Sequence, residues 1–226
     1  MSDTPKAPVK YSKVASQTDA GKEHEKAFFH ALGRFVVNYA RAEEAIQFVL
    51  WHYAKTHESI ARCVFSGVRV KDGMSFIKKI AEVTGATTKT QRDLKDIFDQ
   101  LGVITSVRNE IMHHGIQSIA DGNAFITNAL LAYLPERLTI IPISPTDLDN
   151  MTADIRKIIV TLYVQHAGRP PLQSEENRRV IDEFVRAPWR YKPLVRHPLS
   201  PAGTEKSPRA RKQTPKRTLR PPPSQA

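Results

Sequence analysis

The chain has 226 residues, a formal net charge of +11 and a single cysteine. One cysteine excludes a disulfide framework and a thiolate metal cluster. No run of 18 apolar residues occurs, which argues against a membrane-spanning helix and against membrane binding. We therefore expect a protein of the reducing cytoplasm.

The positive charge is distributed unevenly. Residues 168–226 hold 14 lysines and arginines against five acidic residues, whereas residues 24–167 hold 16 against 15. Eleven of the 16 prolines also lie in 168–226. The basic character therefore belongs to a tail, and a nearly neutral domain precedes it. We predict a disordered arm over 1–21, a helical domain over 22–167 and a basic, Pro- and Arg-rich disordered tail over 168–226.

The hydrophobic pattern predicts four principal helices and one short one. Apolar residues recur at the three- and four-residue spacing of core-facing helices. The first of these helices is long, and the last begins at Ser144-Pro145, with serine at the cap and proline in the first turn. In chain order the helices are expected at about 22–56, at 57–66, from a cap at Asp72 to a stop at Gly85, from Thr88 or Thr90 to His114, and from Ser144 to just before Gly168.

After Gly115 the apolar pattern changes from helical to alternating. Residues 116–119 and 124–127 flank an Asp-Gly turn and predict a β-hairpin. Residues 138–143 predict one more strand, in which Pro142 favours an edge position. The expected fold is all-α: an up-and-down four-helix bundle with a small β-hairpin insertion before the last helix and a disordered basic tail.

Arg108 lies in the middle of the apolar stripe of the helix that ends at His114. An unpaired guanidinium is costly in a core, so Arg108 requires an acidic partner or a polar cleft. Glu43 lies inside the apolar stripe of the first helix, which predicts a Glu43–Arg108 pair across the two helices. Such a pair could be purely structural, and the alternative for Glu43 is a side chain that extends to water.

Asn109 and His113 are four residues apart and so lie on one flank of the same helix. His114 is expected to point about 100° further round, toward solvent. A guanidinium binds phosphate oxygens, an imidazole transfers protons near neutral pH, and an amide can orient either group. This set supports RNA cleavage without a metal or other cofactor. The alternative is that Asn109 and His113 only cap the helix.

Arg108, Asn109 and His113, with four residues between the arginine and the histidine, resemble the signature of the HEPN superfamily of helical RNases and toxins. The resemblance implies a homodimer in which both motifs face one cleft and cleave RNA to a 2′,3′-cyclic phosphate. It implies that Arg108 clamps phosphate, His113 is the acid and base, and Asn109 positions the reacting groups. Glu43 would match the acidic residue of the first long helix. RNA and an antitoxin or other protein are the implied partners.

The competing interpretation is a helical dimerisation or RNA-binding module without catalytic activity. In either case the tail is predicted to be mobile apart from a short helix over 175–185, and to bind polyanions. Its cations can contact phosphates, while Trp189 and Tyr191 could stack on bases. The alternative is a linker that only aids solubility. The predicted nucleic-acid-binding residues are Arg190, Lys192, Arg209, Arg211, Lys212, Lys216, Arg217 and Arg220.

Overall fold

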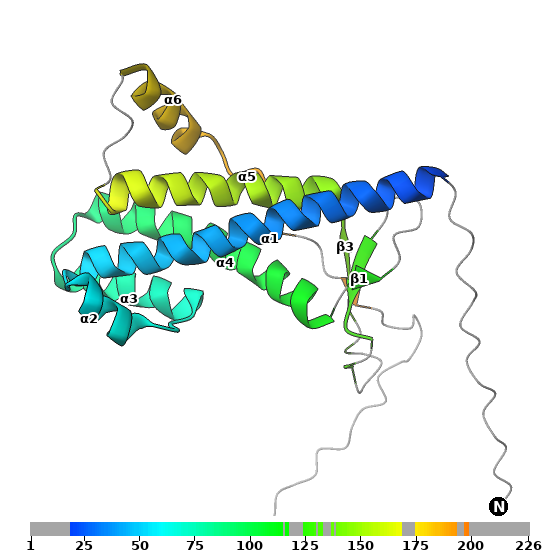
Figure 1. Ribbon diagram of the computed structural model, residues 1–226, viewed down its shortest axis with the longest axis horizontal. Coiled ribbons are helices and arrows are strands. Elements are labelled where there is room, and N and C mark those ends of the chain that lie inside the picture. Colours follow the sequence, from blue (N-terminus) through cyan, green and yellow to red (C-terminus); the bar gives the residue numbers. More distant parts are fainter. Residues whose placement is uncertain are drawn as a thin grey trace, which may run out of the picture.

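The computed structural model is mostly helical, with a small antiparallel sheet at one end (Figure 1). It describes residues 19–114, 116–117, 124–129, 131–132, 137, 139–168, 175–193 and 197–198. None of the helices in these ranges combines the length and the apolar character needed to cross a membrane. In chain order the elements are α1 (Asp19–Ala54), α2 (Glu58–Phe65), α3 (Val70–Val83), α4 (Thr88–His114), β1 (Ile116–Gln117), β2 (Ala124–Thr127), β3 (Thr139–Ile143), α5 (Pro145–Thr161), the π-helical turn η3 (Leu162–His166), α6 (Glu175–Arg186) and β4 (His197–Pro198).

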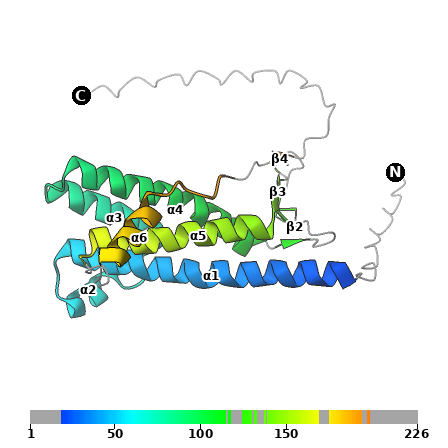
Figure 2. The ribbon, with the colours of Figure 1, turned by 90° about the horizontal axis from the view of Figure 1, so that it is seen from above.

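Helices α1 and α5, which pack against each other most extensively, run side by side in the same direction (Figures 1 and 2). Arg34 Nη2 donates to Asp149 Oδ1 at 2.8 Å near the start of α5, and Tyr53 Oη lies 3.1 Å from His166 Nδ1 beyond its end. Early residues of α1 thus contact early residues of α5, and late residues contact late ones, so the two helices are parallel. Helix α4 runs antiparallel to both (Figure 1). The predicted up-and-down bundle of four helices is not confirmed, because α2 adds a reversal of the chain between α1 and α3.

The core lies where α1, α3, α4 and α5 face one another. Its largest fully buried side chains include Phe28, Phe35, Ile46, Leu50, Ile77, Leu94, Leu101, Ile104, Leu148, Met151 and Ile155. They fall at the predicted helical spacing, so each helix buries one stripe. Gly73 allows α3 to approach α1 closely, because a Cβ there would lie 2.8 Å from Ile46 Cγ2.

The helix ends follow the local sequence in most places. Ser144 caps α5 through a capping box: its Oγ accepts from Asp147 N, and the Asp147 carboxylate accepts from Ser144 N. The predicted start of this helix is confirmed. The predicted cap of α3 is wrong, since α3 begins at Val70 with Arg69 in the cap position and Asp72 already inside the first turn.

The predicted hairpin is confirmed in the residues that the structure describes. Ile116 of β1 lies opposite Ile126 of β2, whereas the turn region 118–123 lies outside the described residues. β3 pairs with β2 on one side and with β4 on the other, so it is not the edge strand that we predicted. Pro142 remains compatible with the sheet because the described pairing with β4 involves only Thr139 and Ile140. The sheet lies where α4 ends and α5 begins (Figure 1).

The segment 187–193, which we call the strap, packs against α4 and α5. The Asp154 carboxylate, on a residue that is 1% exposed, accepts hydrogen bonds from Arg190 N at 2.9 Å and Tyr191 N at 2.8 Å. It also accepts from Gln100 Nε2 at 2.8 Å. The expectation of a mobile tail from residue 168 onward is therefore wrong for the strap, because a buried carboxylate binds its backbone.

The predicted short helix in the tail is confirmed as α6. It has no buried residue, and it packs against α5 on the outside of the helical body (Figures 1 and 2). Because the strap follows α6 directly and is bound by Asp154, the C-terminal end of α6 is held close to α4 and α5.

Candidate functional site

Arg108 lies near the end of α4 in a small groove between α4 and α1. Its guanidinium Nη1 donates to Asn109 Oδ1 at 3.2 Å, and its Cζ lies 5.4 Å from the centroid of the Tyr39 ring. The side chain of Arg108 is half-buried, and Asn109 is exposed. The structure thus brings two of the predicted residues together, with the guanidinium held on an aromatic face.

Tyr39 is a member of this site that the sequence did not indicate, since its position fits an ordinary core stripe. Its hydroxyl and the Thr105 hydroxyl are 3.0 Å apart, and Thr105 in turn donates to the Leu101 carbonyl. Burial raises the pKa of Tyr39, and the Thr105 hydrogen bond lowers it by less. Of the nearby charges, Glu43 raises this pKa and Arg108 lowers it, so both charges lie close to the phenol.

The predicted ion pair between Glu43 and Arg108 does not form. Both residues line the same groove, whose volume is about 90 Å³, but the ion pairs of the described residues do not include this pair within 4.0 Å. Arg108 is not fully buried, so water can solvate part of the guanidinium while the Tyr39 ring and Asn109 contact the rest. Of the two environments predicted for Arg108, an acidic partner or a cleft, the structure therefore gives it the groove and not the carboxylate.

The two histidines at the end of α4 differ from the prediction in their burial. His113 is exposed, one turn after Asn109. His114, which we expected in solvent, has a side chain that is only 21% exposed, and its Nε2 lies 3.0 Å from Glu110 Oε2. In the described part of the chain, the buried His114 Nδ1 has no hydrogen-bond partner. Of the two, His113 is the histidine that a ligand can reach.

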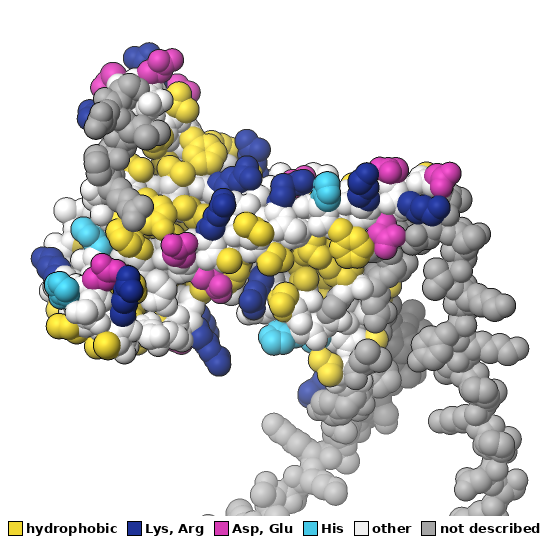
Figure 3. Space-filling model, in the orientation of Figure 1, with side chains coloured by type: hydrophobic (Ala, Val, Ile, Leu, Met, Phe, Trp, Pro, Cys, Tyr) yellow, Lys and Arg dark blue, Asp and Glu magenta, His cyan; other side chains and the backbone are white. Residues whose placement is uncertain are grey.

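Exposed apolar side chains lie in the Arg108 groove and on α1 next to it: Val36 and Met112 line the groove, whereas Phe29 and Val37 line a separate hollow on α1. Met112 on α4 is 58% exposed and Val37 on α1 is 54% exposed, and Phe29 and Val36 on α1 are about as open. Figure 3 shows hydrophobic side chains gathered where α1 passes over the C-terminal part of α4. We call Phe29, Val36, Val37 and Met112 the apolar patch. Exposed apolar side chains that gather in one region mark interaction surfaces more often than side chains that are scattered singly.

Most of the predicted nucleic-acid-binding residues of the tail lie outside the described residues. Arg190 and Lys192 are described, and both are exposed. The predicted stacking of Tyr191 on bases is wrong for this structure, since the residue is 3% exposed. Trp189 is also engaged, because its Nε1 donates to Asp96 Oδ2 at 3.1 Å.

The described histidines, acids and cysteine form no cluster of three or more that could hold a metal ion. Comparison with family models, with curated proteins and with solved structures finds no match. The resemblance to the HEPN superfamily therefore stays a prediction from the sequence motif of Arg108, Asn109 and His113.

Proposed function

We propose that the protein is a HEPN-like, metal-independent endoribonuclease that acts as a homodimer. The observation that carries this proposal is that the end of α4 leaves all three motif side chains accessible. Arg108 is half-buried in the groove, whereas Asn109, its hydrogen-bond partner, and His113 are exposed on the surface of the same helix end. A closed core around these residues would have argued for a purely structural role.

The chemistry requires a proton acceptor, a proton donor and a cation. A neutral imidazole takes the proton of the ribose 2′-hydroxyl, the O2′–P bond forms and the P–O5′ bond breaks. The leaving O5′ takes a proton from an imidazolium, so that the products are a 2′,3′-cyclic phosphate and a 5′-hydroxyl. The Arg108 guanidinium stabilises the negative charge on the non-bridging oxygens.

Two protomers would supply both proton-transfer groups. Val36 and Met112 of the apolar patch line the groove, and we propose that a two-fold contact through this face brings His113 of each chain toward one cleft. One His113 would then act as base while His113 of the partner subunit acts as acid. Glu43, which lines the same groove as Arg108, would act as a positioning residue.

Labelled RNA incubated with the protein in EDTA tests the catalytic part of the proposal. The wild type should release fragments that end in 2′,3′-cyclic phosphate. Arg108→Ala and His113→Ala should each lower the rate by about 100-fold or more, in the range found for general acid–base groups. His24→Ala, an exposed histidine near the start of α1 and 11 residues before the first groove residue of that helix, is the matched control and should cleave at the wild-type rate. Equal cleavage by His113→Ala would refute the catalytic role.

One observation favours the alternative of an RNA-binding or dimerisation module without cleavage. The guanidinium of Arg108 already has an amide and an aromatic ring as partners, an arrangement that also suits a structural role. RNA binding without any cyclic phosphate product would support this alternative. Sedimentation of Val37→Lys tests the dimer in both cases, with Val180→Lys on α6 as the control at an equally exposed valine.

A further inference from the structure

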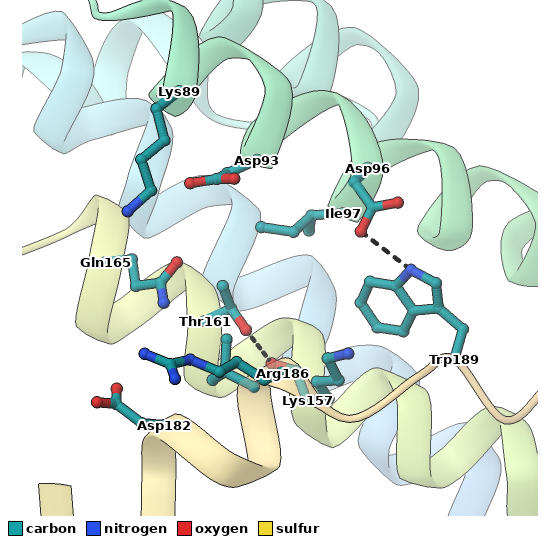
Figure 4. Close-up of a pocket in the computed structure, with 11 residues that line it drawn as sticks. Lys89, Asp93, Asp96, Ile97, Lys157, Thr161, Gln165, Asp182, Arg186 and Trp189 are labelled. Carbon is teal, nitrogen blue, oxygen red and sulfur yellow. Dashed lines mark hydrogen bonds between the residues drawn. The ribbon is translucent and has the colours of Figure 1, made fainter. Parts of the chain in front are cut away.

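A second cleft lies away from the Arg108 groove, between α4, α5 and α6, and the strap closes one end of it (Figure 4). Its volume is about 370 Å³, within the range of small-molecule sites. On α4 its lining ends at Ile97, 11 residues before Arg108, a separation of about 16 Å along the helix. The cleft is therefore separate from the proposed RNA site.

The cleft contains charged side chains of both signs that do not pair with each other. Lys89 and Asp93 on α4, and Asp182 and Arg186 on α6, have the four-residue spacing that allows an ion pair. Pairs with this spacing do close on the outer faces of α2 and α4. Among the described residues, however, no ion pair joins the charges of the cleft within 4.0 Å. Two cations and two carboxylates thus remain available to a ligand.

The end of the cleft next to the strap is already occupied by internal contacts. The Lys157 ammonium donates to the Ala187 carbonyl and lies 3.9 Å from the centroid of the Trp189 ring. Trp189 Nε1 donates to the Asp96 carboxylate. These three side chains build a wall, and the unpaired charges lie toward the opposite end (Figure 4).

We propose that this cleft binds a small zwitterion of the free amino acid class. In Figure 4 the Lys89 and Arg186 side chains extend from different helices toward Gln165, so that a carboxylate placed there would meet two cations and an amide donor. In Figure 4 the Asp93 carboxylate lies on the Lys89 side of this position and the Asp182 carboxylate on the Arg186 side, so that one or the other would accept from the ligand's ammonium group. Ile97 lies between the two ends and offers an apolar contact for the ligand's side chain.

The same charges disfavour an anionic ligand such as a phosphate. A phosphate beside Lys89 and Arg186 would also face the carboxylates of Asp93 and Asp182, which would repel it. A zwitterion instead presents a negative group to the two cations and a positive group to the carboxylates. This inference does not depend on RNA cleavage.

Trp189 provides a direct optical readout, because its indole lines the cleft. The chain has two tryptophans, so Trp51→Phe leaves Trp189 as the only indole reporter. We would titrate this variant with each of the 20 common free L-amino acids, with inorganic phosphate and with adenosine monophosphate. At least one amino acid should change the emission saturably, and its N-acetylated and C-amidated forms should bind about tenfold more weakly, because each lacks one charge.

Variants of the cleft separate specific binding from a surface effect. Arg186→Gln and Asp93→Asn should each weaken binding of that amino acid about tenfold or more. Arg178→Gln, on the same helix but outside the cleft, should leave it unchanged. Circular dichroism of each variant shows whether it remains folded. The proposal is overturned if no amino acid binds, if only phosphate or the nucleotide binds, or if the folded cleft variants bind as tightly as the parent.

Discussion

Replacing Asp154 by alanine should release the strap from the helices. The substitution removes the acceptor of three N–H groups, those of Gln100 Nε2, Arg190 N and Tyr191 N. A hydrogen bond to a charged group contributes about 1.5–3 kcal/mol, but the strap N–H groups can reach water once the strap moves away. Hydration of these N–H groups therefore offsets part of the three lost hydrogen-bond contributions, and we expect the free energy of unfolding to fall by about 3–5 kcal/mol.

Asp154→Asn should lower the free energy of unfolding by an intermediate amount, because it removes one of the three hydrogen bonds and keeps the other two. The asparagine oxygen can replace Oδ2, which accepts from two donors, whereas its NH₂ group cannot accept from Arg190 N. One charged hydrogen bond is lost, at a cost of about 1.5–3 kcal/mol.

Urea unfolding followed by circular dichroism gives the stabilities, and tryptophan fluorescence reports whether Trp189 leaves its site. Asp149→Ala on the same helix is the control, because its carboxylate is about half exposed in an ion pair with Arg34. That substitution should cost less than about 1 kcal/mol. Equal losses for Asp154→Ala and Asp149→Ala, with unchanged tryptophan emission, would refute the reasoning.

Three further predictions concern pH, packing and the tail. Burial lowers the pKa of His166 below the usual 6.5. The stability that neutral His166 contributes is therefore complete above pH 6.5 and is lost as the pH falls through the lower pKa of the folded state. The melting temperature of His166→Gln should accordingly depend less on pH below 6.5 than that of the wild type. Gly73→Ala should cost about 1–3 kcal/mol in urea unfolding because its Cβ would meet α1 at 2.8 Å, whereas Gly102→Ala, with nothing within 4 Å, should stabilise α4 by about 0.5–1 kcal/mol. Truncation after Pro198, which keeps β4, should weaken nucleic-acid binding and its salt dependence while the melting temperature stays unchanged. Truncation after Ala187 should also lower the melting temperature, because it removes the strap.

Local sequence signals predicted the individual elements well. The three- and four-residue spacing of apolar residues gave each helix and its buried stripe, because that spacing is fixed by helix geometry. Ser144, Pro145 and Asp147 defined the start of α5 through a hydrogen-bonding pattern that needs only neighbouring residues. The relative direction of α1 and α5 was missed, since it depends on the reversal of the chain at α2, and no local pattern encodes it.

The candidate site was predicted in part for the same reason. The sequence placed Arg108, Asn109 and His113 on one helix end, which the helical period determines. It did not show that Arg108 would contact the Tyr39 ring instead of Glu43, because that choice depends on how deeply the guanidinium is buried. Asp154 was equally hidden, since its partners Arg190 and Tyr191 lie more than 30 residues away.

The pairing of β4 with β3 determines where the basic end of the chain leaves the folded body. β4 ends at Pro198, and the 28 residues that follow carry seven lysines and arginines and one acidic residue. β1, which follows α4 directly, is three strands away from β4 in the sheet, a distance of about 14 Å. The cationic segment is therefore tethered near the helix end that carries Arg108 and His113. An RNA strand held by that segment would be confined to a small volume around the groove. Binding of the same strand in the groove would then be intramolecular, at a high effective concentration of RNA.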